Sequence, residues 1–114
     1  MGPVPEPRLK TEIRVSAQIR RAQAAGAFAT IARRGDPDAG AVAVKLYLGA
    51  GRGRLYIQSR DLDGNAIWHE PLDDVVEEVH IDAWIEKESN IDPDIWVVEI
   101  EGGDVSGLFQ IAES

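Results

Sequence analysis

Four arginines, arranged as two adjacent pairs, are the residues whose chemistry best suits a ligand. Arg20 and Arg21 fall in a stretch rich in helix-forming residues, and Arg33 and Arg34 end a stretch typical of a strand. A guanidinium can bind phosphate or carboxylate through two parallel N–H donors, so these four side chains are candidate anion-binding residues. The alternative is that they form salt bridges with carboxylates elsewhere in the chain.

The charge of the chain is divided unevenly between its two halves. Residues 1–60 hold 11 basic and 4 acidic side chains, whereas residues 61–114 hold 1 basic and 16 acidic side chains. This asymmetry indicates either an acidic partner for one face or attraction between the two halves within one fold. The net charge of −8 argues against a protein that coats nucleic acid.

Strand alternation bears on the second arginine pair. Neighbouring residues in a strand point to opposite faces, which separates the side chains of Arg33 and Arg34. We therefore expect one of them to pair with an acidic residue of the second half. The other would then be available to an anion.

Motifs of known enzymes are missing from the sequence. There is no Walker A loop, no Gly-x-Ser-x-Gly elbow and no His-Glu-x-x-His pair. Gly49, Gly51 and Gly53 lie between two predicted strands, so they indicate a hairpin and not a dinucleotide site. His69 and His80 lack the repeated spacing of metal ligands, and the chain has no cysteine. We expect no metal and no cofactor, and the sequence favours a non-enzymatic protein.

The elements that must position the arginines are predicted from periodicity. Ile13 and Val15 alternate with polar residues, which predicts a short strand over 11–15. Ser16 is a candidate N-cap for a helix over 17–25, and Gly26 would end that helix. A strand over 28–33 follows.

The rest of the chain predicts mainly strands. They fall at 41–48, 54–60 and 65–70, and a helix over 75–89, capped by Asp74, precedes a last strand over 95–100. Four successive strands with short turns predict an antiparallel meander. The last strand is apolar on both faces, so we expect it to be central, with Trp96 and Val98 in the core. The residues expected to shape turns, the helix stop and the core are Gly26, Gly35, Asp36, Gly40, Asp92, Pro93, Asp94 and Trp96.

These elements predict the fold class and the domain organisation. We expect one α+β domain over 9–101, a mostly antiparallel sheet of about five strands with two helices packed on it. Residues 1–8, with three prolines, are expected to form a flexible tail, and 102–114 a C-terminal extension that is loose or an edge strand. No apolar run approaches the length of a membrane span and no signal peptide is evident, which favours the cytoplasm.

Several short blocks carry a resemblance to a known family. They occur in this order: Val15-Ser16-Ala17, Arg20-Arg21, Ala24-Ala25-Gly26, Arg33-Arg34-Gly35-Asp36, Ala39-Gly40 and Asp92-Pro93-Asp94-Ile95-Trp96-Val97-Val98-Glu99. The chain resembles, over residues 9–101, the bacterial domain-of-unknown-function family 1491, short proteins typical of alphaproteobacteria. The resemblance implies a small cytoplasmic protein of one domain. It implies no activity, cofactor or catalytic residue.

Three functions remain open at this point. We expect a non-enzymatic binding or adaptor domain with a protein partner, of open oligomeric state, that binds neither nucleic acid nor membrane. The first alternative is a binder of a phosphate-bearing ligand, a nucleotide or nucleic acid, through Arg20, Arg21, Arg33 and Arg34. The second is a small enzyme of unrecognised type. Unpaired arginines around a concave surface would favour the phosphate-binding alternative. A buried histidine or carboxylate with a displaced pKa in a pocket would favour the enzyme.

Overall fold

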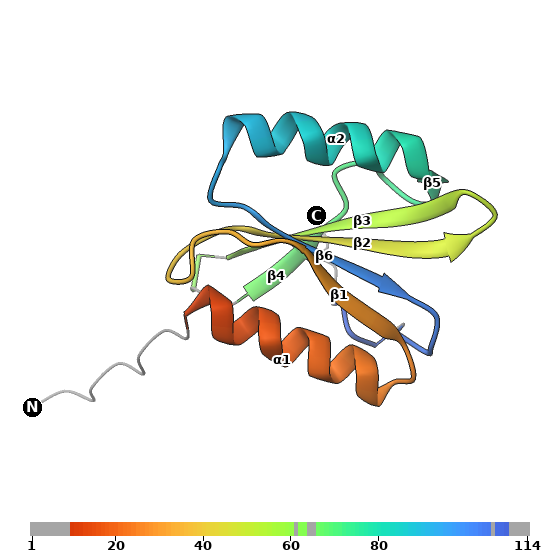
Figure 1. The fold of residues 1–114 in the computed structure, drawn as a ribbon, viewed down its shortest axis with the longest axis horizontal. Helices are drawn as coiled ribbons and strands as arrows, with labels where there is room; N and C mark the ends of the chain where they lie inside the picture. The colour runs from red at the N-terminus through yellow and green to blue at the C-terminus, as the bar shows by residue number, and fades with distance from the viewer. Residues whose placement is uncertain (1–9, 61, 64–65, 106, 110–114) are drawn as a thin grey trace, which may run out of the picture.

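Two helices lie on opposite faces of one mixed sheet (Figure 1). The computed structural model describes residues 10–60, 62–63, 66–105 and 107–109. Within them the elements are α1 Thr11–Ala24, β1 Phe28–Arg33, β2 Val42–Gly49, β3 Arg52–Arg60, β4 Ala66–His69, β5 Val76–Glu77, α2 Glu78–Ile91 and β6 Trp96–Glu101. The expected α+β class is confirmed. Neither helix in these ranges is long and apolar enough to cross a membrane.

The last strand occupies the interior of the sheet. The strand order is β1-β6-β2-β3-β4, with the two-residue β5 paired to β3. All pairings are antiparallel except that between β2 and β6, which is parallel. The expected central position of β6 is therefore confirmed, but the predicted meander is wrong where it made β1 and β2 neighbours. β6 separates them because it is apolar on both faces and gains most from cover on both.

Alternation along the strands divides the core into two clusters. Val44 and Val98 face α1, where they pack with Val15 of that helix. Ala43 and Val97 face the other way, in a cluster with Ile81 of α2. Each helix therefore covers its own face of the sheet, and the period-two pattern predicted for β2 and β6 is confirmed.

The first helix begins earlier than the sequence predicts. Residues 11–15 are its first turns and not a strand, and Ser16 lies inside it and not at its start. The buried residues Thr11, Val15, Gln18 and Ala22 follow helical spacing. That stripe outweighs the short alternation of Ile13 and Val15, because it buries a whole helix face.

The end of α1 is as expected. Gly26 has φ +85°, the left-handed conformation that glycine adopts most easily. Its N–H donates to the carbonyl of Gln23 and the N–H of Ala27 to the carbonyl of Ala22. This is the Schellman arrangement, so the predicted helix stop is confirmed.

The second helix begins later than the predicted residue 75. Val76 and Glu77 pair with β3 as β5, which delays α2 to Glu78 and makes Glu77 its N-cap. The predicted capping role of Asp74 is therefore wrong, since Asp74 forms an ion pair with Arg54. At the other end the Asp92 carboxylate accepts a hydrogen bond from the Asp94 amide at 3.0 Å.

Trp96 fixes the start of β6 against the turn between β1 and β2. Its indole Nε1 donates to the carbonyl of Asp36 at 2.8 Å. A Cβ atom on Gly35 would lie 2.0 Å from the Asp94 carbonyl oxygen and 2.7 Å from the indole ring, and one on Gly40 would lie 2.2 Å and 2.8 Å from the same groups. Both positions therefore require glycine, which gives the sequence block around residues 33–40 a packing explanation.

The chain after β6 contributes to the core. Val105 and Phe109 are buried on the α1 face. The Phe109 ring stacks on Tyr56 with centroids 4.3 Å apart and meets Trp68 edge-on at 5.1 Å. In the described part of the extension, 102–105 and 107–109, these residues pack on the sheet without pairing as a strand. The predicted tail over 1–8 lies outside the described residues.

We expect Trp96→Ala to destabilise the protein by about 3–5 kcal/mol, the range for removing a large buried aromatic side chain. Trp96 is 1% exposed, and its indole packs against both glycines and bonds to Asp36. Phe28→Ala is the control, because Phe28 is 79% exposed; it should shift stability by no more than about 0.5 kcal/mol. Urea unfolding measures both, and equal stabilities would contradict the role assigned to Trp96.

Candidate functional site

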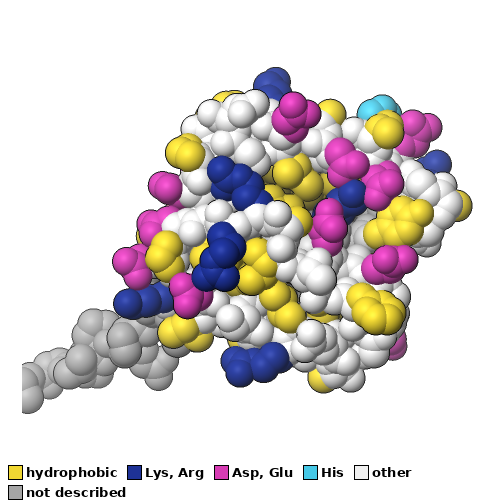
Figure 2. All heavy atoms as spheres, in the orientation of Figure 1, with side chains coloured by type: hydrophobic (Ala, Val, Ile, Leu, Met, Phe, Trp, Pro, Cys, Tyr) yellow, Lys and Arg dark blue, Asp and Glu magenta, His cyan; other side chains and the backbone are white. Residues whose placement is uncertain are grey.

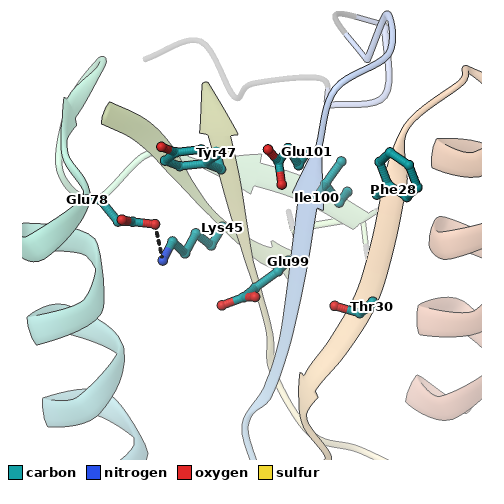
Figure 3. Close-up of a pocket in the computed structure, with 8 residues that line it drawn as sticks. All are labelled: Phe28, Thr30, Lys45, Tyr47, Glu78, Glu99, Ile100 and Glu101. Atoms are coloured by element: carbon teal, nitrogen blue, oxygen red, sulfur yellow. Dashed lines mark ion pairs between the residues drawn. The ribbon is translucent and has the colours of Figure 1, made fainter. Parts of the chain in front are cut away.

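A groove of about 450 Å³ opens beside α2, where the helix leaves part of its face of the sheet uncovered (Figure 3). α2 packs mainly over β2 and β3 and also covers Val97 near the start of β6, so β1 and the end of β6, with Glu99 and Glu101, have no helix above them on this face. The groove is lined by Phe28, Thr30, Lys45, Tyr47, Glu78, Glu99, Ile100 and Glu101. The backbone of three strands therefore positions almost every residue that lines it.

The strand registers arrange these side chains in two rows. Phe28 of β1 lies opposite Glu101 of β6, which in turn lies opposite Tyr47 of β2. The second row lies two residues further along each strand and consists of Thr30, Glu99 and Lys45. Neighbouring strands are about 4.8 Å apart and successive residues on one face about 7 Å apart. The groove floor is thus a regular grid with Glu99 and Glu101 in its middle column.

Lys45 is the one basic residue among those that line the groove, and the fold neutralises it. Its side chain is 8% exposed, and Nζ lies 2.9 Å from the Glu78 carboxylate and 2.6 Å from that of Asp82. Burial alone would lower the pKa of Lys45, but the hydrogen bonds and charges of Asp82 and Glu78 raise it above its usual 10.5. The charged lysine therefore holds the start of α2 against β2.

The remaining carboxylates give the groove an excess of negative charge. Glu99 and Glu101 are exposed, and neither forms an ion pair with any residue in the described ranges. Figure 2 shows acidic side chains gathered round a basic one on this side of the molecule, with hydrophobic side chains beside them. With Glu78, three carboxylates and one ammonium line the groove, and Asp82 also pairs with that ammonium. A cationic ligand suits this field, and an anionic one does not.

Aromatic side chains border the acidic column on both sides. Phe28 is 79% exposed, an unusual state for a phenylalanine in a strand. Tyr47 is half-buried, and its hydroxyl accepts a hydrogen bond from the Gly51 amide at 3.3 Å. Figure 3 shows both rings on the same side of the sheet as Glu99 and Glu101. The groove can therefore contact the apolar part of a ligand as well as its charge.

The second arginine pair is engaged in internal contacts. Arg33 donates from one guanidinium nitrogen to the carbonyls of Pro93 at 2.9 Å and Ile95 at 2.7 Å. Arg34 lies 5.0 Å from the centre of the Trp96 ring and 3.6 Å from the Glu12 carboxylate. The expectation of one acidic partner from the second half is wrong, because Glu12 belongs to the first half and Arg33 bonds to backbone. Turn geometry brings these groups together, and alternation along a strand carries no information about it.

The first arginine pair lies apart from the second. Arg20 and Arg21 are exposed on α1, and no ion pair involving either is found in the described ranges. Arg34 contacts Glu12 at the start of this helix, about 12 Å along the axis from Arg20. The anion-binding role of the four arginines stays a prediction. The two pairs lie at separate places on the surface and do not form one cluster.

A partly buried ion pair forms a second cluster on the α1 side of β3. Arg54 Nε lies 3.0 Å from the Glu70 carboxylate and the guanidinium also contacts Asp74. Burial raises the pKa of Glu70, and the charge of Arg54 opposes that rise. Arg54 and Tyr56 line a shallow pocket of about 310 Å³ whose lining does not include Glu70. We interpret these ion pairs as structural contacts that hold the 70–74 turn on β3. The displaced pKa of Glu70 does not require a catalytic role, because structural ion pairs also displace pKa values.

Sequence reasoning missed the acidic groove. Lys45 in an apolar run was a usable signal, because a lysine between buried residues needs a carboxylate partner. For Glu99, Glu101 and Phe28 the sequence offers no comparable signal, because each fits an ordinary strand. What unites them is the insertion of β6 between β1 and β2, a long-range pairing that periodicity does not contain.

The chain is similar to a family of known sequence and to solved structures of that family. The family model described as "Protein of unknown function (DUF1491)" matches residues 9–110. A crystal structure of a DUF1491 family protein from Caulobacter crescentus is 44% identical, covering 93% of this chain and 100% of that one, with a TM-score of 0.80. The solution structure of protein Atu0922 from A. tumefaciens is 35% identical, covering 95% and 98%, with a TM-score of 0.81. No curated protein is similar to this chain.

Replacing Lys45 by methionine should destabilise the protein in a pH-dependent way. The folded-state pKa lies above 10.5, so the stabilisation is complete below the unfolded value and is lost as pH rises through the folded one. We expect Lys45→Met to lower the free energy of unfolding by about 1.5–3 kcal/mol at pH 7, the range for hydrogen bonds to charged groups. The difference should shrink above pH ~10.5.

Urea unfolding at pH 7, 9 and 11 measures this effect. Lys87→Met is the matched control, since Lys87 is an exposed lysine of α2, the helix that Lys45 contacts from β2; it should change stability by less than about 0.5 kcal/mol. A Lys45→Met difference that stays constant up to pH 11 would contradict the ion-pair explanation.

Proposed function

We propose a function for this chain, which belongs to the DUF1491 family of proteins of unknown function: it is a non-enzymatic binding domain that holds a basic segment of a partner protein in the groove beside α2. The observation that carries the proposal is the column formed by Glu99 and Glu101. Their two carboxylates have no ion-pair partner in the described ranges and lie beside an exposed phenylalanine.

The spacing of the groove matches an extended peptide. Side chains two residues apart in an extended segment are about 7 Å apart, which is also the separation of Glu99 and Glu101 along β6. Lysine or arginine at such positions could bond to each carboxylate in turn. Phe28 and Tyr47 would then contact their aliphatic stems or stack under their charges.

The charge of the groove separates this proposal from the phosphate-binding alternative. A phosphate in the groove would meet the carboxylates of Glu78, Glu99 and Glu101 and one lysine that is already paired, so the field opposes it. We place the protein in the bacterial cytoplasm as part of the proposal. Support for this comes from the absence of cysteine, which suits a reducing compartment, and from the bacterial origin of similar structures.

The test is fluorescence anisotropy with a labelled peptide of alternating lysine and threonine. We expect saturable binding that weakens with salt, because screening reduces attraction between exposed charges. Glu99→Gln combined with Glu101→Gln should weaken it about five- to tenfold, since each exposed pair is worth up to about 1 kcal/mol. A peptide with glutamate in place of lysine should not bind.

The control for this double variant removes the same two charges elsewhere. Glu12 and Asp38 are exposed and lie at the start of α1 and in the turn before β2. Glu12→Gln with Asp38→Asn raises the net charge equally, so it separates a local effect from a global one. If both double variants weaken binding alike, or neither does, the groove is not the binding site.

Duplex DNA should bind weakly or not at all. The net charge is −8 and Arg33 and Arg34 are engaged internally. We expect a dissociation constant no tighter than about 10⁻⁴ M at physiological salt. Anisotropy titrations at two salt concentrations measure it. Micromolar binding that is steeply salt-dependent and lost in Arg20→Ala/Arg21→Ala would instead support the arginine hypothesis.

A further inference from the structure

We infer that the partner segment binds by adding a strand to the open edge of β1, with basic residues at every second position. This inference rests on the proposed function and specifies how the same groove is used. It concerns the backbone of β1 as much as the carboxylates of β6.

The outer edge of β1 is available and unprotected. β1 pairs with β6 on one side, and in the described ranges no strand pairs with its other side. Proteins usually protect such edges with charges, prolines, bulges or very short strands. Phe28–Ile31 contains no charge and no proline, and the one irregularity of β1 comes after it, between Ile31 and Arg33. The opposite edge, β4, is four residues long.

A strand added at this edge would extend the two rows of the groove. Its side chains on the α2 face would lie beside Phe28 and Thr30, in line with Glu101 and Glu99. The added backbone would be about 4.8 Å from β1 and about 10 Å from β6. Lysine and arginine stems are long enough to cross Phe28 or Thr30 and bring their charges to the carboxylates. Main-chain hydrogen bonds would supply affinity, and the alternating side chains specificity.

A second copy of this chain fits the edge less well. Two β1 strands pairing about a two-fold axis perpendicular to the sheet would bring the Glu99 and Glu101 columns of both copies onto one face. These carboxylates are already without cationic partners in the described ranges, and each copy carries a net charge of −8. Repulsion therefore favours a basic partner over self-pairing.

The test uses two versions of the alternating lysine–threonine peptide with N-methylated amides. One carries the methyl groups on the lysine amides and the other on the threonine amides, so both have equal charge and equal methylation. In a strand the amides of alternate residues point to opposite sides. With the lysines directed to the groove, only one of the two sets of amides can point to β1.

We expect one methylated peptide to lose about tenfold or more in affinity for the full chain and the other to stay within about threefold of the parent peptide. Equal binding of both, or equal loss in both, would overturn strand addition. If the parent peptide still responds to Glu99→Gln/Glu101→Gln in that case, the proposed function stands without it. If the parent peptide does not bind at all, the proposed function itself fails. Sedimentation analysis of the protein alone that shows a dimer dissociated by Thr30→Pro would assign the edge to a second copy and overturn the inference.

Discussion

The burial of both faces of β6 is the constraint on which the rest of the structure depends. Val97 on one face and Val98 on the other both lie in hydrophobic clusters. A strand of this kind cannot lie at an edge, so it enters between β1 and β2 and needs a layer on each side. Trp96 sets its position, because the indole bonds to Asp36 and packs between two glycines that tolerate no side chain. The turn before β2, the turn after α2 and the start of β6 are thereby fixed together.

The groove follows from how the two helices share the task of covering the sheet. α1 lies over β1 and β6 on one face, and α2 lies over β2 and β3 on the other. The second arrangement covers Val97 but leaves β1 and the end of β6 without a helix on the α2 side, which is where Glu99, Glu101 and Phe28 become accessible. Lys45 stabilises this offset, since its ammonium joins β2 to the first turns of α2. The same ion pairs neutralise Lys45, the one basic residue that lines the groove, so its charge does not repel a cationic ligand.

Local pattern predicted the elements better than their arrangement. The alternation of β2 and the two-sided apolar character of β6 were readable, because both depend on neighbours along the chain. The start of α1 was not, since Ile13 and Val15 fit a strand as well as a helix until the burial of Thr11 and Gln18 is known. The acidic groove was beyond reach for a different reason. Its rows join residues of β1, β6 and β2, and no sequence period records a parallel pairing between segments about fifty residues apart.

The internal ion pairs explain part of the uneven charge of the chain and show which charges stay unpaired in the described ranges. Lys45 and Arg54, both from the basic first half, are paired with carboxylates of the second half. Attraction between the halves within one fold, one of the two explanations of the asymmetry, is therefore confirmed for these residues. Arg33 and Arg34 are likewise engaged in internal contacts, whereas Arg20 and Arg21 form no ion pair in the described ranges. The surplus that remains is negative, and in the groove it coincides with an exposed aromatic ring and an open strand edge. That coincidence, and not the composition, is the reason to look for a basic partner.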